Sequence, residues 1–144
     1  MSVFITGGGV IPVFISTVNI TADNIENYFT VNNSSYYFKG NGSVFTTNNG
    51  GEQSSEAKTT LTALFDMDIS FDYSYSSEEN YDKFSLTFAG TKVENEVSGV
   101  TTNKNYSGKL TAGQTIVFTY SKDNSQDKNG DKCTFSNMVI TGKF

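Results

Sequence analysis

A short acidic segment is the first candidate for a functional site in this sequence. Glu78, Glu79 and Asp82 lie together beside Tyr81. Glycoside hydrolysis uses two carboxyl groups that face each other across a sugar, and one of them needs surroundings that raise its pKa. Neighbouring positions in one turn do not provide that arrangement, so we interpret Glu78 and Asp82 as hydrogen-bond acceptors that fix a corner. In a binding protein, the same carboxylates could contact a ligand next to Tyr81.

A second acidic segment offers oxygen ligands at every second position, which is the ligand type that Ca²⁺ prefers: Asp123, Ser125, Asp127, Asn129 and Asp131. An EF-hand is excluded, because Ser136 stands where that loop needs a bidentate Glu. A Ca²⁺ loop of another kind would use Asp123, Asp127 and Asp131 as metal ligands. The alternative is a polar hairpin tip whose charges serve solubility.

Two tyrosines next to predicted loops, Tyr81 and Tyr106, complete the candidate ligand-binding residues. Aromatic rings give a flat apolar surface on which a sugar can stack, although aromatic residues in strands more often pack in the core. We expect Tyr81 and Tyr106 to be exposed and to bind a ligand together with Glu78 and Asp82.

Missing residue types exclude much other chemistry. The chain has no His and no Trp, and its ten basic residues are all Lys. Without His it lacks the commonest general base and zinc ligand, and without Arg it lacks the bidentate clamp for phosphate. A formal net charge of -5 disfavours binding to a nucleic-acid backbone. We therefore expect a protein that is not an enzyme and does not bind nucleic acid.

Alternating apolar and polar residues predict that strands carry the candidate residues. The pattern is clearest over residues 59–65, 67–75, 84–88 and 116–120, and weaker runs cover 28–31, 36–39, 43–47, 100–106 and 134–141. Polar loops over 48–56 and 122–132 separate some of them. The only helical signal is one turn over 21–27, which Thr21 could cap. About eight or nine short strands indicate an all-β sandwich or barrel.

The apolar positions of these strands predict the hydrophobic core: Leu61, Phe65, Ile69, Phe71, Phe84, Leu86, Phe88, Ile116, Phe118 and Ile140. A chain of 144 residues can bury a core of this kind without disulfides, and Cys133 is its single cysteine. We expect one sandwich domain over residues 19–144.

The first 18 residues are predicted to be an apolar arm that precedes this domain. They carry no charged side chain, and the first Lys is Lys39, so a secretory signal with a basic start is not indicated. A glycine run and Pro12 interrupt the apolar stretch, which excludes a membrane helix.

The arm contains two β-prone runs whose exposed edges would be sticky in water. One interpretation is that residues 10–15 form the first strand of the sandwich. The other is strand addition to a second copy or to another protein, through the apolar residues Val3, Phe4, Ile5, Val10, Ile11, Val13, Phe14 and Ile15.

Several sequence runs suggest a family: residues 69–73 (ISFDY), 76–83 (SSEENYDK), 84–86 (FSL), 112–116 (AGQTI) and 120–125 (YSKDNS). In order, they resemble the strands and corners of jelly-roll sandwiches of the concanavalin-like and MAM-like group, which occur in bacterial surface and phage proteins. The resemblance covers a little over half of the chain. It implies an antiparallel jelly-roll sandwich, a fold that serves lectins, adhesion modules and enzyme appendages alike.

Composition and arm together favour a non-enzymatic bacteriophage virion protein. It would decorate the particle or attach it to a host, held to its own copies or to other virion proteins through the arm and facing a host-surface glycan. We expect it on the virion surface, without membrane insertion and without a cofactor other than Ca²⁺. The alternative is a carbohydrate-binding module of a secreted bacterial surface protein or enzyme, which would place it outside the cell.

Overall fold

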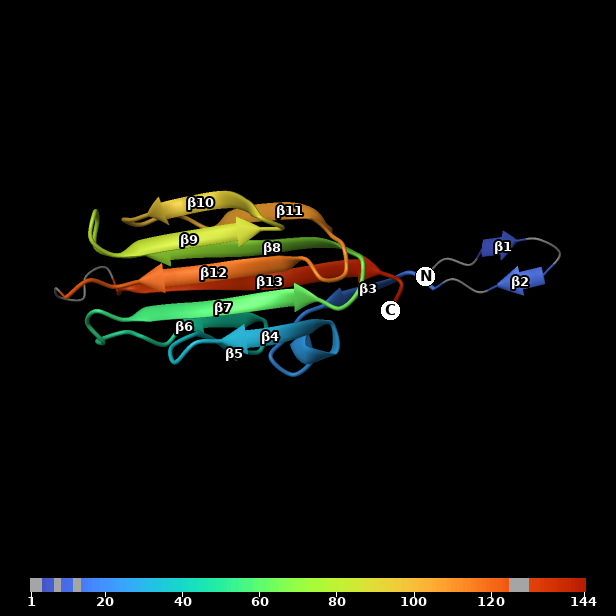
Figure 1. The fold of residues 1–144 in the computed structure, drawn as a ribbon, viewed down its shortest axis with the longest axis horizontal. Coiled ribbons are helices and arrows are strands. Elements are labelled where there is room, and N and C mark those ends of the chain that lie inside the picture. Colours follow the sequence, from blue (N-terminus) through green and yellow to red (C-terminus); the bar gives the residue numbers. More distant parts are fainter. Residues whose placement is uncertain (1–3, 7–8, 12–13, 125–129) are drawn as a thin grey trace.

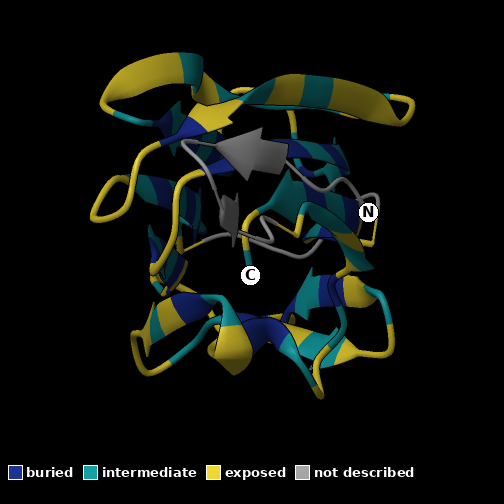
Figure 2. Cartoon of the chain, turned by 90° about the vertical axis from the view of Figure 1, so that its right-hand side faces the viewer, coloured by how far each residue is buried: buried dark blue, intermediate teal, exposed yellow. Residues whose placement is uncertain are grey.

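Alternating side chains along most of the chain produce extended strands with one apolar and one polar face. The computed structural model describes residues 4–6, 9–11, 14–124 and 130–144. Within them, two antiparallel sheets face each other (Figure 1) and the core lies between them. Viewed end-on, the buried residues lie on the strands of both layers, and exposed residues gather in the loops and along the outer edges (Figure 2). The predicted all-β sandwich is confirmed.

The first sheet has five strands in the order β10-β9-β12-β7-β4. These are β10 (Thr91–Val97), β9 (Lys83–Phe88), β12 (Thr115–Ser121), β7 (Glu56–Ala63) and β4 (Phe29–Asn33). The second sheet runs β11-β8-β13-β6-β5, with β3 also paired to β13. Its strands are β11 (Lys104–Leu110), β8 (Met67–Ser76), β13 (Lys132–Gly142), β6 (Val44–Thr47), β5 (Phe38–Asn41) and β3 (Ser16–Asn19).

Successive strands cross repeatedly from one sheet to the other, as in a jelly roll. The chain changes sheet from β7 to β8, from β8 to β9 and at each step from β10 to β13. The described residues contain eleven sandwich strands, more than the eight or nine predicted. The strand β10 was missed because its sequence, TKVENEV, is polar on both faces, as suits a strand at a sheet edge.

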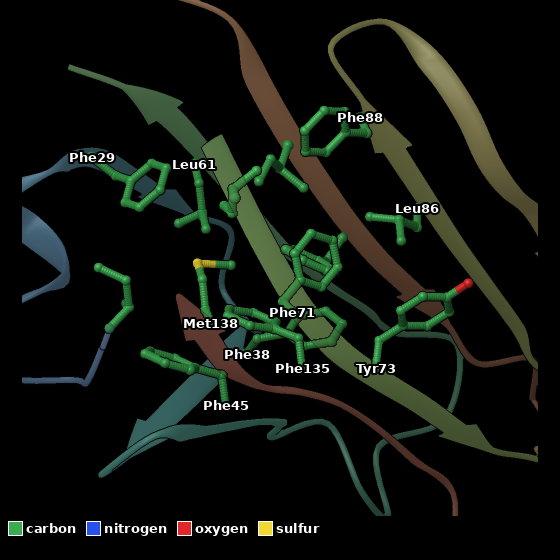
Figure 3. Close-up of a cluster of buried hydrophobic side chains, with 14 of the residues drawn as sticks. Phe29, Phe38, Phe45, Leu61, Phe71, Tyr73, Leu86, Phe88, Phe135 and Met138 are labelled. Carbon is green, nitrogen blue, oxygen red and sulfur yellow. The ribbon is translucent and has the colours of Figure 1, made fainter. Parts of the chain in front are cut away.

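Aromatic rings dominate the core, where Phe45, Phe71 and Phe135 lie close together (Figure 3). Phe118 stacks on Phe135 with ring centroids 4.2 Å apart, and Phe135 stacks on Phe45 at 4.6 Å. Phe71 meets Phe118 edge-on at 5.5 Å, so the rings join strands of both sheets. Such pairs add to the free energy gained by burying their area.

Nine of the ten predicted core residues are buried: Leu61, Ile69, Phe71, Phe84, Leu86, Phe88, Ile116, Phe118 and Ile140. The prediction for Phe65 was wrong, since its side chain is 38% exposed. The strand β7 ends at Ala63, where the backbone N–H donates to the carbonyl of Gln114 and the chain turns toward β8. Alternation therefore stops before Phe65, whose ring lies against Phe144 near the surface.

The predicted helical turn is a short 3-10 helix, η1 (Ile25–Asn27). Asn24, not Thr21, occupies the N-cap position, and its side-chain oxygen accepts a hydrogen bond from the backbone N–H of Thr21 at 2.8 Å. The described part of the chain holds no helix with the length and apolarity needed to cross a membrane.

The N-terminal segment forms a small hairpin of its own. Its strands β1 (Phe4–Thr6) and β2 (Gly9–Ile11) pair with each other and lie beyond one end of the sandwich (Figure 1). Pairing within the sandwich starts at Ser16 of β3, so residues 10–15 are not its first strand. Among the predicted assembly residues, Val3 and Val13 fall outside the described residues, Phe14 is exposed and Ile15 is half-buried.

Candidate functional site

The outer face of the six-stranded sheet is polar, because the apolar residues of its strands point inward to the core and the polar residues between them point outward. Along β8 the residues Ile69, Phe71 and Tyr73 point inward and are buried. The intervening residues of β8 and the matching residues of β11 and β13 face outward: Asp68, Ser70, Asp72, Ser74, Asn105, Ser107, Lys109, Thr134 and Ser136. We call this surface the Asp72 face.

At its centre the carboxylate of Asp72 is held by asparagine amides from both neighbouring strands. Asn105 lies directly opposite Asp72 in the register of β11 and β8, and its Nδ2 donates to Oδ1 at 3.0 Å. From β13, Nδ2 of Asn137 donates to Oδ2 at 3.1 Å. Asn103 supplies a further side-chain hydrogen bond. These bonds, led by that from Asn105, lower the pKa of the Asp72 carboxyl against the opposing effect of burial.

A β-bulge in β13 brings Asn137 to this position. The register of β13 against β8 shifts between Ser136 and Val139, and Asn137 adopts a φ of 50°. Asparagine tolerates this left-handed conformation better than most residues. Its backbone N–H donates to the carbonyl of Ser43 at 3.2 Å, which ties the bulge to the turn before β6. The bulge thus aims an amide at Asp72, a recurrent use of bulges near functional sites.

Two depressions hollow the outer surface of the six-stranded sheet, one on the Asp72 face and one over the neighbouring strands β5 and β6. One, of about 440 Å³, is lined by residues of β11, β8 and β13 that include Ser70, Ser107 and Thr141. The other, of about 600 Å³, lies over β5 and β6 and includes Lys39 and Asn41. Most of the residues that line each depression carry hydroxyl, amide or charged side chains, but the exposed surface of both depressions is mainly apolar. The arrangement offers fixed donors and acceptors along an open strip.

No protein-family model and no curated protein matches the sequence. Among solved structures, the secreted serine protease VesC from Vibrio cholerae is similar over 85% of this chain, with a TM-score of 0.64 and 12% identity. This chain spans 28% of that protein. The likeness to VesC shows the fold alone.

Two further solved structures align over 89% of this chain at lower TM-scores. The K3 adhesin domain of Lys-gingipain from Porphyromonas gingivalis has a TM-score of 0.49 at 12% identity, and the alignment covers 99% of it. A family 29 carbohydrate-binding module has a TM-score of 0.46 at 16% identity, with 92% of it covered.

The predicted ligand-binding residues of the 76–83 corner differ in exposure: Tyr81 is at the surface and Asp82 is buried. Tyr81 is 58% exposed, as expected. The carbonyl of Glu78 accepts hydrogen bonds from the backbone N–H groups of Tyr81 and Asp82, which makes one tight turn of the corner. Asp82 is 1% exposed and accepts a hydrogen bond from the backbone N–H of Asp123 at 3.0 Å. It holds the corner against the segment that follows β12.

Tyr106, the other predicted binding tyrosine, lies away from Tyr81. Its ring is half-buried and packs against Phe88 at 4.7 Å and Phe71 at 5.9 Å, between the two sheets. The segment around it still contributes to the Asp72 face, but through Asn103 and Asn105.

The Asp-rich segment that was predicted to bind metal is only partly described. Asp127 lies outside the described residues, and Asp131 is buried against Lys122. Within the described residues, carboxylate atoms of Glu78, Asp82 and Asp123 lie within 4.8 Å of one another. The amine of Lys122 lies 3.7 Å from Asp82 and already brings a positive charge to this group. The Ca²⁺ site stays a prediction.

Sequence reasoning missed Asp72, Asn105 and Asn137 as a group. The alternation over residues 67–75 does place Asp72 on an outer face. Its partners are distant in sequence, and the bulge that presents Asn137 has no signature in the alternating pattern.

Proposed function

We propose that this protein is a non-enzymatic module that binds neutral carbohydrate across the Asp72 face. The observation that carries the proposal is the fixed Asp72 carboxylate, held by amides of Asn105 and Asn137 on the same outer sheet surface as two depressions. A module of this kind acts outside a cell, on a cell surface or on a virion surface.

The chemistry of the face suits sugar hydroxyls. Each hydroxyl both donates and accepts hydrogen bonds, and an ionised carboxylate accepts at up to four lone-pair positions. The lowered pKa keeps Asp72 ionised, so its hydrogen bonds with a sugar are charge-assisted. Because the asparagines already fix its orientation, little conformational entropy is lost on binding.

Charge supports a neutral ligand. The chain carries a formal net charge of -5, and Asp72 adds a local negative charge to the face. Sialylated, sulfated or uronic-acid glycans would be repelled by that charge.

The carboxyl groups of the structure favour binding over hydrolysis. A glycosidase needs an acid with a raised pKa that faces the sugar beside a second carboxylate. Asp82 has a raised pKa because it is buried, yet its side chain lies beneath the corner and not on the Asp72 face. Asp72 itself is held in the ionised form.

The proposal is tested by screening the protein against neutral and acidic polysaccharides, followed by titration calorimetry of any ligand found. A hydrogen bond to a charged group contributes about 1.5–3 kcal/mol, so Asp72→Asn should weaken binding about tenfold or more. Asn137→Ala should weaken binding as well. Asn32→Ala is the matched control, since Asn32 is exposed on β4 of the other sheet.

Binding that survives Asp72→Asn but is lost in Tyr81→Ala would move the site to the corner. Binding of acidic glycans alone would contradict the choice of a neutral ligand. A folded protein that binds none of the polysaccharides would exclude a carbohydrate-binding function.

A second candidate function is that of a virion component held by its N-terminal arm. The observation that favours it is the β1–β2 hairpin, which within the described residues pairs with no strand of the sandwich. An isolated two-stranded hairpin is marginal in water, and partner strands at its edges would stabilise it. Co-purification of the native protein with phage particles would support this function, and its absence from purified particles would contradict it.

A further inference from the structure

A buried lysine and two buried carboxyl groups meet at one end of the sandwich, apart from the Asp72 face. Lys122 follows β12, Asp131 precedes β13 and Asp82 precedes β9. Nζ of Lys122 lies 2.9 Å from Oδ2 of Asp131 and 3.7 Å from Oδ2 of Asp82. All three side chains are at most 2% exposed.

This cluster is unusual in its burial and its charge. Surface ion pairs such as Lys109 with Asp68 stay hydrated, with exposed fractions of 84% and 58%. Two ionised carboxylates beside one ammonium group would leave a net negative charge in a water-poor site, which is costly. Burial raises the pKa of the Asp82 carboxyl, against the opposing effects of the backbone hydrogen bond from Asp123 and the charge of Lys122.

One side of the cluster is apolar or neutral, while on another side the carboxylates of Glu78 and Asp123 lie within 4.8 Å of that of Asp82. The phenol of Tyr120, which is fully buried, donates to Oδ2 of Asp82 at 3.4 Å, and its ring lies 6.0 Å from Nζ of Lys122. Cys133 is fully buried close by, and burial raises the pKa of its thiol, which keeps it neutral.

We propose that Lys122 and Asp131 condense into an intramolecular isopeptide bond, with Asp82 as the group that transfers protons. The contact holds the amine beside the carboxyl group of Asp131, so that the step occurs within one folded molecule. Exclusion of solvent favours condensation, because the product amide is not exposed to hydrolysis.

The step balances without any co-reactant. A proton of the Lys122 ammonium group passes to the Asp131 carboxylate. The lone pair of the neutral amine Nζ then attacks Cγ of Asp131. The protonated carboxyl of Asp82 donates to the departing hydroxyl and, as a carboxylate, takes a proton from Nζ. The C–O bond breaks, one water molecule leaves, and an Nζ–Cγ amide remains with Asp82 again protonated.

The bond would tie the end of β12 to the start of β13 and close the loop between them. A cross-link of this type restricts the unfolded chain and so stabilises the folded state, as a disulfide does. The corner over 76–83 contacts the linked segment through Asp82, which accepts a hydrogen bond from the backbone N–H of Asp123.

The test is the mass of the intact, denatured protein, followed by tryptic digestion. We expect the full chain to be lighter than its sequence mass by one water molecule. Trypsin should not cleave after Lys122, and the peptides on either side of Lys128 should stay joined by a link from Lys122 to Asp131. In a chain without the link, cleavage at Lys128 separates these residues.

Variants distinguish the roles. Asp131→Ala and Lys122→Met should show the full sequence mass, and Asp82→Ala should slow or abolish the loss of water. Asp68→Ala, which breaks the exposed ion pair with Lys109, is the matched control and should still lose water.

Because the mass of the wild-type protein is the deciding measurement, the test does not depend on whether the variants fold. A wild-type chain of full mass that trypsin cleaves after Lys122 would overturn the proposal. A loss of water that maps to other residues would overturn it equally, and an undiminished loss in Asp82→Ala would overturn the role of Asp82.

Discussion

Asp72 and Asp82 show how the same side chain takes opposite roles in two environments. Asp72 lies at the surface, where asparagine amides donate to it and lower its pKa. Asp82 lies beneath the corner, where burial outweighs both the backbone hydrogen bond from Asp123 and the charge of Lys122 and raises its pKa. The first is therefore suited to accept hydrogen bonds from a ligand, and the second to hold or transfer a proton.

A pH titration of the Asp72 carboxyl by NMR tests its environment. Its pKa in the folded protein should lie below the ordinary value of about 3.9 and should rise in Asn105→Ala. Because the folded pKa is lowered, the stability that Asp72 contributes is present above the unfolded value and is lost as pH falls through the folded value. An unchanged midpoint in Asn105→Ala would contradict the assigned hydrogen bonds, and Asn32→Ala serves as control.

Truncation of Phe118 tests the aromatic core. Its ring is fully buried and contacts Phe135, Phe71 and Phe38. Phe118→Ala should lower the free energy of unfolding by about 3–5 kcal/mol, the usual range for a buried Phe. Leu64→Ala, at a side chain that is 44% exposed, should change it by less than about 0.5 kcal/mol. If urea denaturation gave the same loss of stability for both variants, Phe118 would not lie in the core as described.

At the scale of elements, β11 must approach the five-stranded sheet closely. Its residue Gly108 faces inward, where the rings of Phe88 and Tyr106 fill the space that a side chain would need. The edge beside it is closed by an ion pair between Lys104 of β11 and Glu94 of β10, 3.2 Å apart. Glycine at this position therefore lets an edge strand of one sheet pack on the other.

Gly108→Ala tests this packing. An added Cβ would lie 2.8 Å from Cε1 of Phe88 and 3.2 Å from Cε2 of Tyr106, so the rings would have to move. Overpacking of this kind costs about 1–3 kcal/mol, to be measured by chemical denaturation. Gly50→Ala is the matched control, since its Cβ would meet nothing within 4 Å. If both variants were equally stable, β11 would not pack as closely as described.

At the scale of the whole molecule, the sandwich and the N-terminal hairpin are joined through β3. This strand pairs with β13 from Ser16 to Asn19, opposite Gly142 to Val139. The hairpin β1–β2 lies beyond it, outside both sheets (Figure 1). The sandwich therefore has its own core, and strand addition at the hairpin edges would leave that core intact.

Deletion of residues 1–13 tests whether the arm serves assembly. The deletion keeps β3, so we expect a folded, soluble monomer with an unchanged melting temperature. If the arm pairs with other copies, the full chain should form larger species that the deletion abolishes, as measured by light scattering after gel filtration. An unfolded or aggregated product would instead show that the arm belongs to the core of the sandwich.

The sequence alone determined the fold class and most of the core, because side-chain alternation is a local property of an extended chain. Alternation over residues 67–75 assigned Ile69 and Phe71 to the interior and Asp72 to the surface, as the structure has them. It failed at Phe65 because the end of β7 at Ala63 depends on a hydrogen bond with Gln114, a distant residue.

Which polar residues lie together depends on how the strands are ordered in the folded protein. The partners of Asp72 come from β11 and from a bulge of β13, and the cluster of Asp82, Lys122 and Asp131 joins the ends of three strands. The order and register of strands in a sheet are set by packing across the whole core, which no local pattern records. Local alternation therefore showed where each side chain points, and the strand order of the folded sandwich determined which side chains meet.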